Sequence, residues 1–261
     1  MRQYVDKLTT VHSKGYIVDF ERIEKVRNNG ETYHYYTLDN KKIPTVTEIL
    51  EGFVPKPQLI NWAAREAGLW AQNNLEILNQ SPSTIAQNVT NNAFNARDES
   101  AERGTRIHAL VEMILTQGNC EVGKEDSGEI KAMLEWLNAY NPKVIACEAK
   151  IFHNVLKYGG TLDLLCEIDG ETWLIDLKTG KKIYNEVALQ LAAYENATHI
   201  VLNGEVVPMV KVDKVGVLHL HGGELNFLEV FKDSRHWDLF ETGYYFFQWH
   251  KKDSKKIFKT I

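Results

Sequence analysis

The segment from Thr161 to Lys178 restricts the possible folds of this chain more than any other part of its sequence. Asp169-Gly170 lies between two runs of alternating apolar residues, which predicts two antiparallel strands joined by a type I′ turn. A two-residue turn pairs Ile168 with Glu171, Cys166 with Trp173, Leu164 with Ile175, and Leu162 with Leu177. From Cys166 outward these pairs are apolar and share one face, so we expect this face to pack on the core.

The opposite face of the same hairpin carries charged residues. The register puts Asp163 directly across from Asp176, and Lys178 across from Thr161. Side chains in such positions lie roughly 5 Å apart, where two like charges destabilise a sheet. A divalent cation between the carboxylates removes this cost, and carboxylate oxygens suit Mg²⁺ or Mn²⁺. The sequence therefore predicts a metal site on this face, with Lys178 projecting to the same side as Asp176.

A solvated surface hairpin is the alternative interpretation of these residues. Outward Asp and Lys side chains beside an Asp-Gly turn are common, and most of them are simply hydrated. Two features favour the metal site instead. The strand Trp173–Lys178 is too apolar for an exposed edge, and Gly159-Gly160 precedes the strand of Asp163.

Four residues outside the hairpin are candidates for the same site. His108 lies four residues before Glu112 on an amphipathic helix, and a neutral imidazole is a suitable third metal ligand. A packed or half-exposed helix residue is the alternative for His108. Glu148 lies in the strand before the hairpin, where a salt bridge at the strand edge is the alternative role. Gln190 and Tyr194 share one face of the following helix, and core packing is the alternative for Tyr194.

The balance of charge limits how this chain could bind a polyanion. The sequence has 30 Lys and Arg residues against 35 Asp and Glu residues, a net charge of -5. This excludes nucleic-acid or anionic-lipid binding over the whole surface, but it permits a local basic cleft. Two groups of basic residues are candidates, although such runs are usually solvated: Lys178, Lys181 and Lys182, and then Lys251, Lys252, Lys255 and Lys256. The first group lies beside the expected metal site and suits a phosphate.

The cysteines and the apolar runs indicate the class of protein. Cys120, Cys147 and Cys166 are odd in number and include no CxxC pair, so we expect no disulfide framework, zinc knuckle or four-cysteine iron–sulfur site. No apolar run reaches the roughly 18 residues of a transmembrane helix, and the N-terminal segment lacks the apolar core of a signal peptide. We therefore expect a cytoplasmic protein that does not contact membranes.

The remaining sequence predicts a mixed α/β protein. We expect irregular strands in 1–44 with a polar turn at Asn28-Asn29-Gly30, a helix capped by Thr45 or Thr47, and a long helix at about 58–79. A polar helix–loop region at 81–97 then precedes a helix that begins at Asp98 or Ser100. Apolar residues recur at i, i+3, i+4 and i+7 in this helix and in the next, which predicts a core-facing stripe on each: Ile107, Leu110, Val111 and Ile114, and then Ile130, Met133, Leu134 and Leu137. Further expected elements are helices at about 126–140, 185–199 and 233–251, and strands at 144–152, 161–168, 171–178, 209–220 and 225–231. Residues 1–97 are expected to form an N-terminal strand and helical accessory lobe, and residues 98–261 the core with the C-terminal strands and helix.

Five short motifs occur in the order and at the spacings of a known enzyme family. They are Gly104-Thr105-Arg106-Ile107-His108, Glu148, Gly160-Thr161-Leu162-Asp163, Asp176-Leu177-Lys178-Thr179-Gly180, and Gln190-Leu191-Ala192-Ala193-Tyr194. Together they resemble the PD-(D/E)XK nuclease superfamily, specifically its RecB-like and phage-exonuclease-like branch. The segment Pro44–Leu50 also resembles an N-terminal segment that is common in phage members. The resemblance covers about 100–200, with weaker likeness on either side.

The resemblance implies a fold and roles for individual residues. The implied fold is a restriction-endonuclease-like core of a helix, a three-stranded antiparallel sheet, a helix and a strand. The implied metal ligands are His108, Asp163, Asp176 and the Leu177 backbone carbonyl, with Lys178 as the catalytic lysine and Glu148 as an auxiliary acid. Gln190 and Tyr194 are expected near DNA, together with Lys181, Lys182 and Arg106 of the basic cleft. Some relatives bind an iron–sulfur cluster through four cysteines, but no cysteine follows Cys166, so we expect no cluster here.

These features together predict a Mg²⁺- or Mn²⁺-dependent deoxyribonuclease. We expect an exonuclease acting on single-stranded DNA or duplex ends in recombination, repair or replication, in a bacterial or phage-infected cell. A replication or recombination protein is a candidate partner. The alternatives are a catalytically silent nucleic-acid-binding module and a metal-dependent hydrolase of another phosphate ester. Silent modules typically lose the lysine or one aspartate, and both are intact here, while the lack of a P-loop excludes only the commonest nucleotide-binding design.

Overall fold

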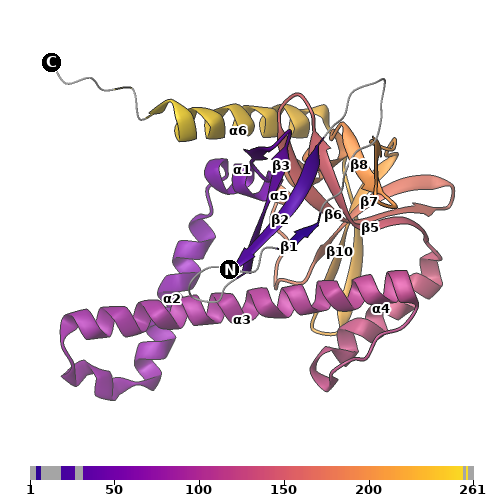
Figure 1. Ribbon diagram of the computed structural model, residues 1–261. Coiled ribbons are helices and arrows are strands. Elements are labelled where there is room, and N and C mark those ends of the chain that lie inside the picture. The colour runs from indigo at the N-terminus through magenta and orange to yellow at the C-terminus, as the bar shows by residue number, and fades with distance from the viewer. Residues whose placement is uncertain (1–3, 7–18, 27–31, 255–256, 258–261) are drawn as a thin grey trace.

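The computed structural model describes residues 4–6, 19–26, 32–254 and 257, and it has the mixed α/β fold that the sequence predicts (Figure 1). Its centre is a seven-stranded sheet with the order β11-β10-β7-β6-β5-β8-β9. Neighbouring strands are antiparallel except β10 and β7, which are parallel. The strands are β5 (Lys143–His153), β6 (Tyr158–Ile168), β7 (Glu171–Lys178), β8 (His199–Leu202), β9 (Glu205–Pro208), β10 (Lys214–His221) and β11 (Glu224–Val230).

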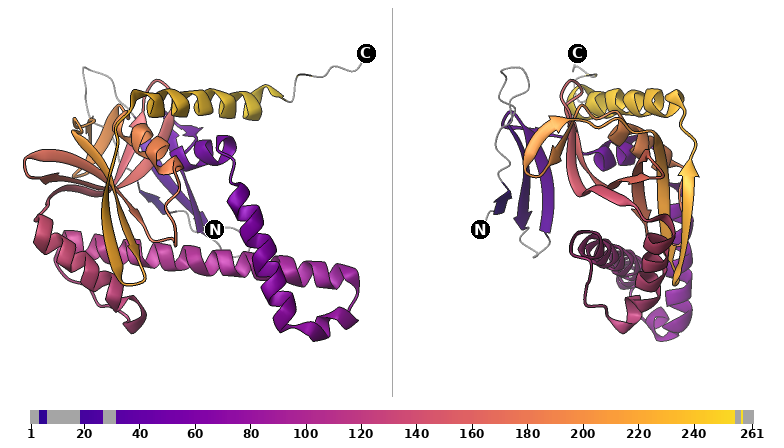
Figure 2. Two further views of the ribbon diagram at one scale, coloured as in Figure 1. Left: turned by 180° about the vertical axis from the view of Figure 1, so that it is seen from behind. Right: turned by 90° about the vertical axis from the view of Figure 1, so that its right-hand side faces the viewer.

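Helices cover both faces of this sheet, and each face has its own hydrophobic core (Figure 2). One core includes residues of α1 (Val46–Phe53), α5 (Glu186–Glu195) and α6 (Ser234–Lys252), and the other includes residues of α3 (Pro82–Gln117) and α4 (Ser127–Tyr140). A sheet buried on both faces explains the nearly continuous apolar runs of β6 and β7. Within the described residues, no helix is long and apolar enough to cross a bilayer.

A second sheet of four antiparallel strands lies beside the central one. Its strands are β1 (Tyr4–Asp6), β2 (Phe20–Val26), β3 (Thr32–Leu38) and β4 (Lys41–Ile43). Phe20 and Tyr36 pack with Phe152 of β5 in a small third core, and the ring centroids of Phe20 and Phe152 lie 4.5 Å apart. The strands predicted for this region are thus present, while the turn predicted at Asn28-Asn29-Gly30 lies outside the described residues.

Helix α1 begins directly after the second sheet with a reciprocal cap, which confirms the cap predicted at Thr45. The Thr45 hydroxyl accepts the Glu48 N–H at 3.0 Å, and the Glu48 carboxylate accepts the Thr45 N–H at 2.8 Å. Val46, Ile49 and Leu50 of this helix are buried in the core shared with α5 and α6. Part of the predicted accessory lobe therefore belongs to the main core.

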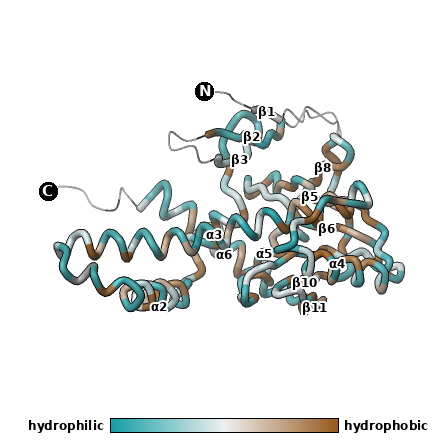
Figure 3. Tube along the Cα trace, turned by 90° about the horizontal axis from the view of Figure 1, so that it is seen from below, coloured by the Kyte–Doolittle hydropathy of each residue, from teal (hydrophilic) through white to brown (hydrophobic). Residues whose placement is uncertain are grey.

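A helical arm (residues 57–97) projects away from the central sheet (Figures 1 and 3). It consists of α2 (Pro57–Asn73), the 3₁₀ helix η1 (Leu75–Asn79) and the first half of α3. The long helix predicted for 58–79 is present, with its last residues in η1. The helix start predicted at Asp98 or Ser100 was wrong, because Ser81 already caps α3 and the helix continues to the left-handed Gly118. The predicted domain boundary between residues 97 and 98 therefore falls inside one helix.

The apolar stripes predicted for two helices are largely confirmed. Ile107, Leu110, Val111 and Ile114 of α3 are buried, as are Ile130 and Met133 of α4. Leu134 was also predicted to face the core, but it is 43% exposed. Trp136 is buried in the core under α4 instead, because the buried stripe continues three residues beyond Met133.

The segment 196–213 differs from the prediction, because helix α5 ends at Glu195 rather than near 199 and the strand expected from 209 begins at Lys214. It contains the hairpin β8–β9, which adds two strands to the edge of the central sheet next to β5. Asn203 and Gly204 form its turn with φ values of 52° and 81°. An Asn-Gly pair between two apolar runs is a strong hairpin signal, so this hairpin was predictable from the sequence.

Candidate metal centre and active site

The hairpin β6–β7 forms with the predicted turn and with most of the predicted register. Asp169 and Gly170 have φ values of 52° and 81°, and Leu164 pairs with Ile175, Cys166 with Trp173, and Ile168 with Glu171. The paired residues end at Leu164 and Ile175, so the three pairs predicted beyond them are not part of the ladder: Asp163–Asp176, Leu162–Leu177 and Thr161–Lys178. Leu162 packs in the opposite core from Leu164, which means that β6 turns over at Asp163.

The ladder ends because the carboxylate of Asp163 replaces a backbone acceptor. Its Oδ2 atom accepts the Leu177 N–H at 2.6 Å. The two strands therefore separate where the sequence predicts facing carboxylates. This hydrogen bond fixes the Asp163 side chain to the backbone of the opposite strand.

Glu148 lies next to Asp163, in strand β5, which pairs with the edge of β6 opposite to β7. Its neighbours Cys147 and Ala149 pair with Leu164 and Leu162, which brings Glu148 level with Asp163. Glu148 has a φ of 49°, a left-handed conformation that is uncommon for a residue other than glycine. Strained positions of this kind gather at functional sites, because the surrounding structure must hold them.

His108 of α3 completes a compact group with these two acids. Its Nδ1 atom lies 3.6 Å from Oε1 of Glu148 and 3.8 Å from Oδ1 of Asp163. One donor atom from each of the three residues lies within 4.8 Å of the others. Imidazole nitrogen and carboxylate oxygen are suitable ligands for a divalent cation, so these residues fit a metal ion.

Asp176 lies near this group but is directed at a lysine. Its side chain is 2% exposed, and its Oδ1 atom has no hydrogen-bond partner among the described residues. The Oδ2 atom lies 2.7 Å from Nζ of Lys178. Lys178 also donates to Oε1 of Gln190 at 3.1 Å, and Nε2 of Gln190 donates to the Tyr194 hydroxyl at 3.2 Å. Gln190 and the buried Tyr194 therefore hold Lys178 from the side of α5.

Burial sets the protonation of these groups. It raises the pKa of Asp163 from 3.8 to about 7, and the negative charge of Asp176 adds to this effect. Burial also raises the pKa of Asp176, although Lys178 opposes the shift. Burial lowers the pKa of His108, but the contact with Glu148 and the charge of Asp163 outweigh it and raise this pKa overall. A bound cation would favour the ionised carboxylates, and it would therefore lower the pKa values that burial and the neighbouring negative charges raise.

A cavity of about 10 Å³ is lined by His108, Glu148 and Asp163. This volume is close to the smallest that can hold one water molecule. Apolar residues and two further ionisable residues, Glu112 and Cys147, also line it. Burial raises the pKa of the Cys147 thiol to about 12, and the charge of Glu148 reinforces this shift. The thiol therefore stays protonated in the metal-free site.

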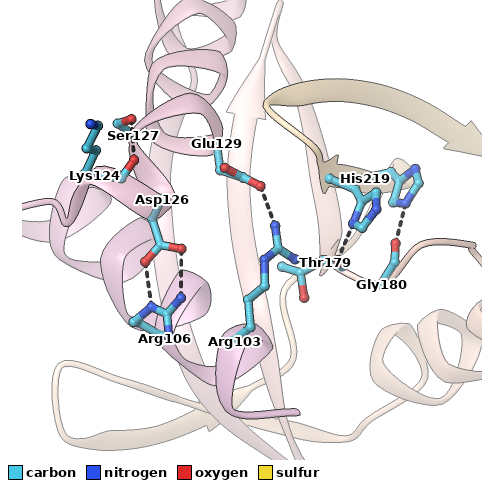
Figure 4. Close-up of polar contacts among 10 residues, drawn as sticks. Arg103, Arg106, Lys124, Asp126, Ser127, Glu129, Thr179, Gly180 and His219 are labelled. Atoms are coloured by element: carbon cyan, nitrogen blue, oxygen red, sulfur yellow. Dashed lines mark hydrogen bonds and ion pairs between the residues drawn. The ribbon is translucent and has the colours of Figure 1, made fainter. Parts of the chain in front are cut away.

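The predicted DNA-binding arginine, Arg106, is engaged in an ion pair (Figure 4). Its Nε atom lies 2.5 Å from Oδ2 of Asp126, a carboxylate that is 2% exposed, and a second nitrogen donates to Oδ1 at 3.0 Å. Lys181 and Lys182, by contrast, lie exposed in the loop after β7. Of the residues predicted to form the basic cleft, Lys181 and Lys182 are thus exposed to solvent, whereas Arg106 is paired with a buried carboxylate.

The loop after Lys178 is held by residues that the sequence analysis missed. Arg103 of α3 pairs with Glu129 of α4 and donates to the Thr179 carbonyl at 3.1 Å (Figure 4). His219 and His221 of β10 contact the carbonyls of Gly180 and Thr179 at 2.7 and 3.1 Å. No sequence motif links these residues, because they come from α3, α4 and β10, which meet only in the fold. The parallel pairing of β10 with β7 places His219 beside Lys178.

The fold and the site define a mixed α/β protein with a candidate divalent-metal group beside a buried aspartate–lysine pair. The chain is similar to mitochondrial genome maintenance exonuclease 1 of Mus musculus, with 30% identity over 174 residues. The match covers 62% of this chain and 46% of the relative, so the chain spans about half the length of the curated relative it matches. No family model matches the chain.

We expect Asp163→Asn to make the metal-free protein more stable at neutral pH. The pKa of Asp163 rises from 3.8 to about 7 on folding, so the folded state binds the proton more tightly and stability falls as pH rises through this interval. An uncharged asparagine avoids this loss, and each pKa unit corresponds to about 1.4 kcal/mol. Urea unfolding in EDTA should show a gain of a few kcal/mol at pH 8 that vanishes near pH 4.

The exposed Asp98→Asn is the matched control for this prediction, because Asp98 forms a surface pair with Arg97. The control should change the free energy of unfolding by less than about 1 kcal/mol at both pH values. A gain for Asp163→Asn that is equal at pH 4 and pH 8 would contradict the assignment of the raised pKa to this carboxylate.

Arg106→Ala should destabilise the fold, because it leaves the buried Asp126 carboxylate without its partner. We expect a loss of folding free energy that is larger than at an exposed pair but smaller than at a fully buried pair, because Arg106 is half exposed. The hydrogen bond from Arg106 lowers the pKa of Asp126, so this contribution is present above the usual pKa of an aspartate and is lost as pH falls through the folded value. Arg97→Ala, at an exposed pair, should cost less than about 1 kcal/mol, and equal losses in the two variants would refute the prediction.

Proposed function

We propose that this chain is a metal-dependent deoxyribonuclease of the PD-(D/E)XK type that hydrolyses phosphodiester bonds. The observation that carries the proposal is the group of His108, Glu148 and Asp163 beside the Asp176–Lys178 pair. Carboxylates with a nearby lysine suit hydrolysis of an anionic ester, because the lysine offsets the charge of the phosphate. The similarity to a protein named as an exonuclease supports the same reaction class and favours action from a DNA end.

Glu148, Asp163 and His108 would hold the cation, with Asp176 and the Leu177 carbonyl as further proposed ligands. Mg²⁺ or Mn²⁺, when bound, polarises a phosphoryl oxygen and lowers the pKa of a coordinated water. His108 must be neutral to contribute a nitrogen, so the same pH increase that ionises Asp163 also prepares His108. The site therefore gains its ligands together as the pH rises through and above neutrality.

Lys178 would orient the attacking water and stabilise charge that develops on the phosphate. Its ammonium contacts both the Asp176 carboxylate and the amide oxygen of Gln190, so two partners fix its position. Tyr194 in turn fixes Gln190 through its hydroxyl. This series of contacts holds the lysine in place before substrate arrives, which reduces the entropy lost in the reaction.

The exposed loop with Lys181 and Lys182 would guide the DNA backbone toward the metal. Both lysines follow Lys178 within four residues, and their side chains are open to solvent. A protein with a net charge of -5 needs such a local source of positive potential to attract a polyanion. Gln190, Tyr194 and Arg106 remain proposed contacts on the DNA side of this site.

The proposal is tested by incubating the protein with end-labelled single-stranded, double-stranded and closed circular DNA. We expect degradation of linear DNA in Mg²⁺ or Mn²⁺, resistance of the circles, and no reaction in EDTA. Asp163→Asn should abolish the reaction because it removes one charged ligand. Binding of DNA without any cleavage in either metal would favour the silent nucleic-acid-binding module instead.

Lys178→Ala should lower kcat for DNA hydrolysis by about 100-fold or more and leave Mn²⁺ affinity nearly unchanged, because the lysine is not a ligand. Steady-state cleavage rates and calorimetric titration of Mn²⁺ at pH 8 measure the two effects. Lys211→Ala is the matched control, since Lys211 is exposed and pairs only with the surface residue Asp213 among the described residues. A large loss of Mn²⁺ affinity in Lys178→Ala would refute its proposed role.

Changing Lys181 and Lys182 together to Ala should weaken the salt dependence of DNA binding. Each lost phosphate contact reduces the slope of log affinity against log salt by roughly 0.7–0.9, so we expect a decrease of between about one and two. Fluorescence anisotropy in Ca²⁺, which we expect to occupy the site without supporting cleavage, measures binding alone. Lys251 and Lys252 changed to Ala form the control pair, and a smaller slope in that pair only would move the DNA track to the end of α6.

A further inference from the structure

A groove of about 390 Å³ lies between the second sheet and the central core. Arg22 and His34 line it from the second sheet, Thr47 and Glu48 from the start of α1, and Glu148 and Thr161 from the central sheet. Glu148 also lines the small cavity beside His108 and Asp163, so one residue belongs to both spaces. The groove therefore adjoins the candidate metal group directly.

The floor of the groove is fixed by contacts between the two sheets. The hydroxyl of Tyr36 lies 2.5 Å from Oγ1 of Thr161, and the Gly159 N–H donates to the Pro44 carbonyl at 3.0 Å. Gly160 must lack a side chain, because a Cβ atom there would lie 2.8 Å from the ring of Tyr194. These contacts hold the groove open in the folded protein, so a ligand would meet a largely preformed site.

The charges in the groove do not suit a phosphate. Three carboxylates line it, those of Glu48, Glu51 and Glu148, against a single arginine, Arg22. The Nε atom of Arg22 is buried and has no hydrogen-bond partner among the described residues. Such a lining favours an uncharged ligand that both donates and accepts hydrogen bonds.

We propose that this groove binds the nucleoside, the base with its sugar, of the nucleotide whose phosphate lies at the metal group. The inference rests on the proposed nuclease function and names the part of the substrate that a second site recognises. Carboxylates accept hydrogen bonds from base amino groups and sugar hydroxyls, and Arg22 donates to base carbonyls or ring nitrogens. The exposed ring of His34 offers a surface for stacking of the base.

The size of the groove agrees with this ligand. Sites for small organic molecules are typically about 300–1,000 Å³, and 390 Å³ is near the lower end of this range. The position of Glu148 between the two spaces puts the sugar and base on the side of the second sheet while the phosphate stays by His108 and Asp163. The Pro44–Leu50 segment, which is far from the catalytic motifs in sequence, thereby gains a role in binding substrate.

Ligand-observed NMR titration of deoxyadenosine and thymidine into the full chain tests the proposal without any catalytic step. We expect both nucleosides to bind in the millimolar range or better, and neither inorganic phosphate nor deoxyribose to compete. Thr47→Trp fills the groove and should weaken nucleoside binding at least fivefold, as should Arg22→Met. Thr242→Trp, at an exposed threonine of α6 outside the groove, is the matched control and should bind like the unchanged protein.

The same variants give a second measurement on DNA. Thr47→Trp should raise KM for DNA hydrolysis more than it lowers kcat, because the groove binds substrate and does not contact the reacting atoms. Nucleoside binding that is absent, or that is unchanged in both groove variants, overturns the inference even if the chain hydrolyses DNA. Nucleoside binding that the groove variants abolish, in a chain that cleaves no DNA, supports the groove and removes the nuclease proposal instead.

Discussion

The burial of two carboxylates beside each other is the constraint on which the rest of the site depends. The side chain of Asp176 is 2% exposed and that of Asp163 is 17% exposed, and burial raises the pKa of each. A buried charge without a partner is costly, so each acid needs compensation. The Leu177 N–H and His108 provide it for Asp163, and Lys178 provides it for Asp176. Even so, Oδ1 of Asp176 has no partner within the described residues, and a cation could satisfy it.

The backbone of the sheet makes room for this arrangement by departing from regular pairing twice. The β6–β7 ladder ends beyond Leu164, and Glu148 adopts a left-handed conformation in β5. The strain at Glu148 is maintained by regular pairs on either side of it, at Cys147 and Ala149. These two irregularities bring acids from β5 and β6 toward one helix residue, His108, although the three are far apart in the sequence. The site is therefore a consequence of where regular hydrogen bonding stops.

Local patterns in the sequence predicted the hairpin, the helical stripes and the Thr45 cap, because each depends on neighbouring residues alone. The membership of Glu148 in the group of three was not predictable in this way. It depends on the register of β5 against β6, which irregular pairing between Val144 and Ala146 shifts. The length of α3 was missed because the polar segment before residue 98 has weak helix preference, and contact with α2 outweighs it. Arg103 was missed because its partners, Glu129 of α4 and the Thr179 carbonyl after β7, lie far from it in the sequence and meet it only in the folded chain.

The helical arm and the core differ in the free energy that local unfolding requires. Helix α2 has no buried residue, so few apolar contacts oppose its local unfolding, whereas the second half of α3 is anchored by Ile107, Leu110, Val111 and Ile114. Backbone amides of the arm should therefore exchange with solvent through small fluctuations, while those around His108 exchange only when the core itself opens. Because the arm and the core segment share the continuous helix α3, the transition from fast to slow exchange occurs along this helix, within a few turns of His108.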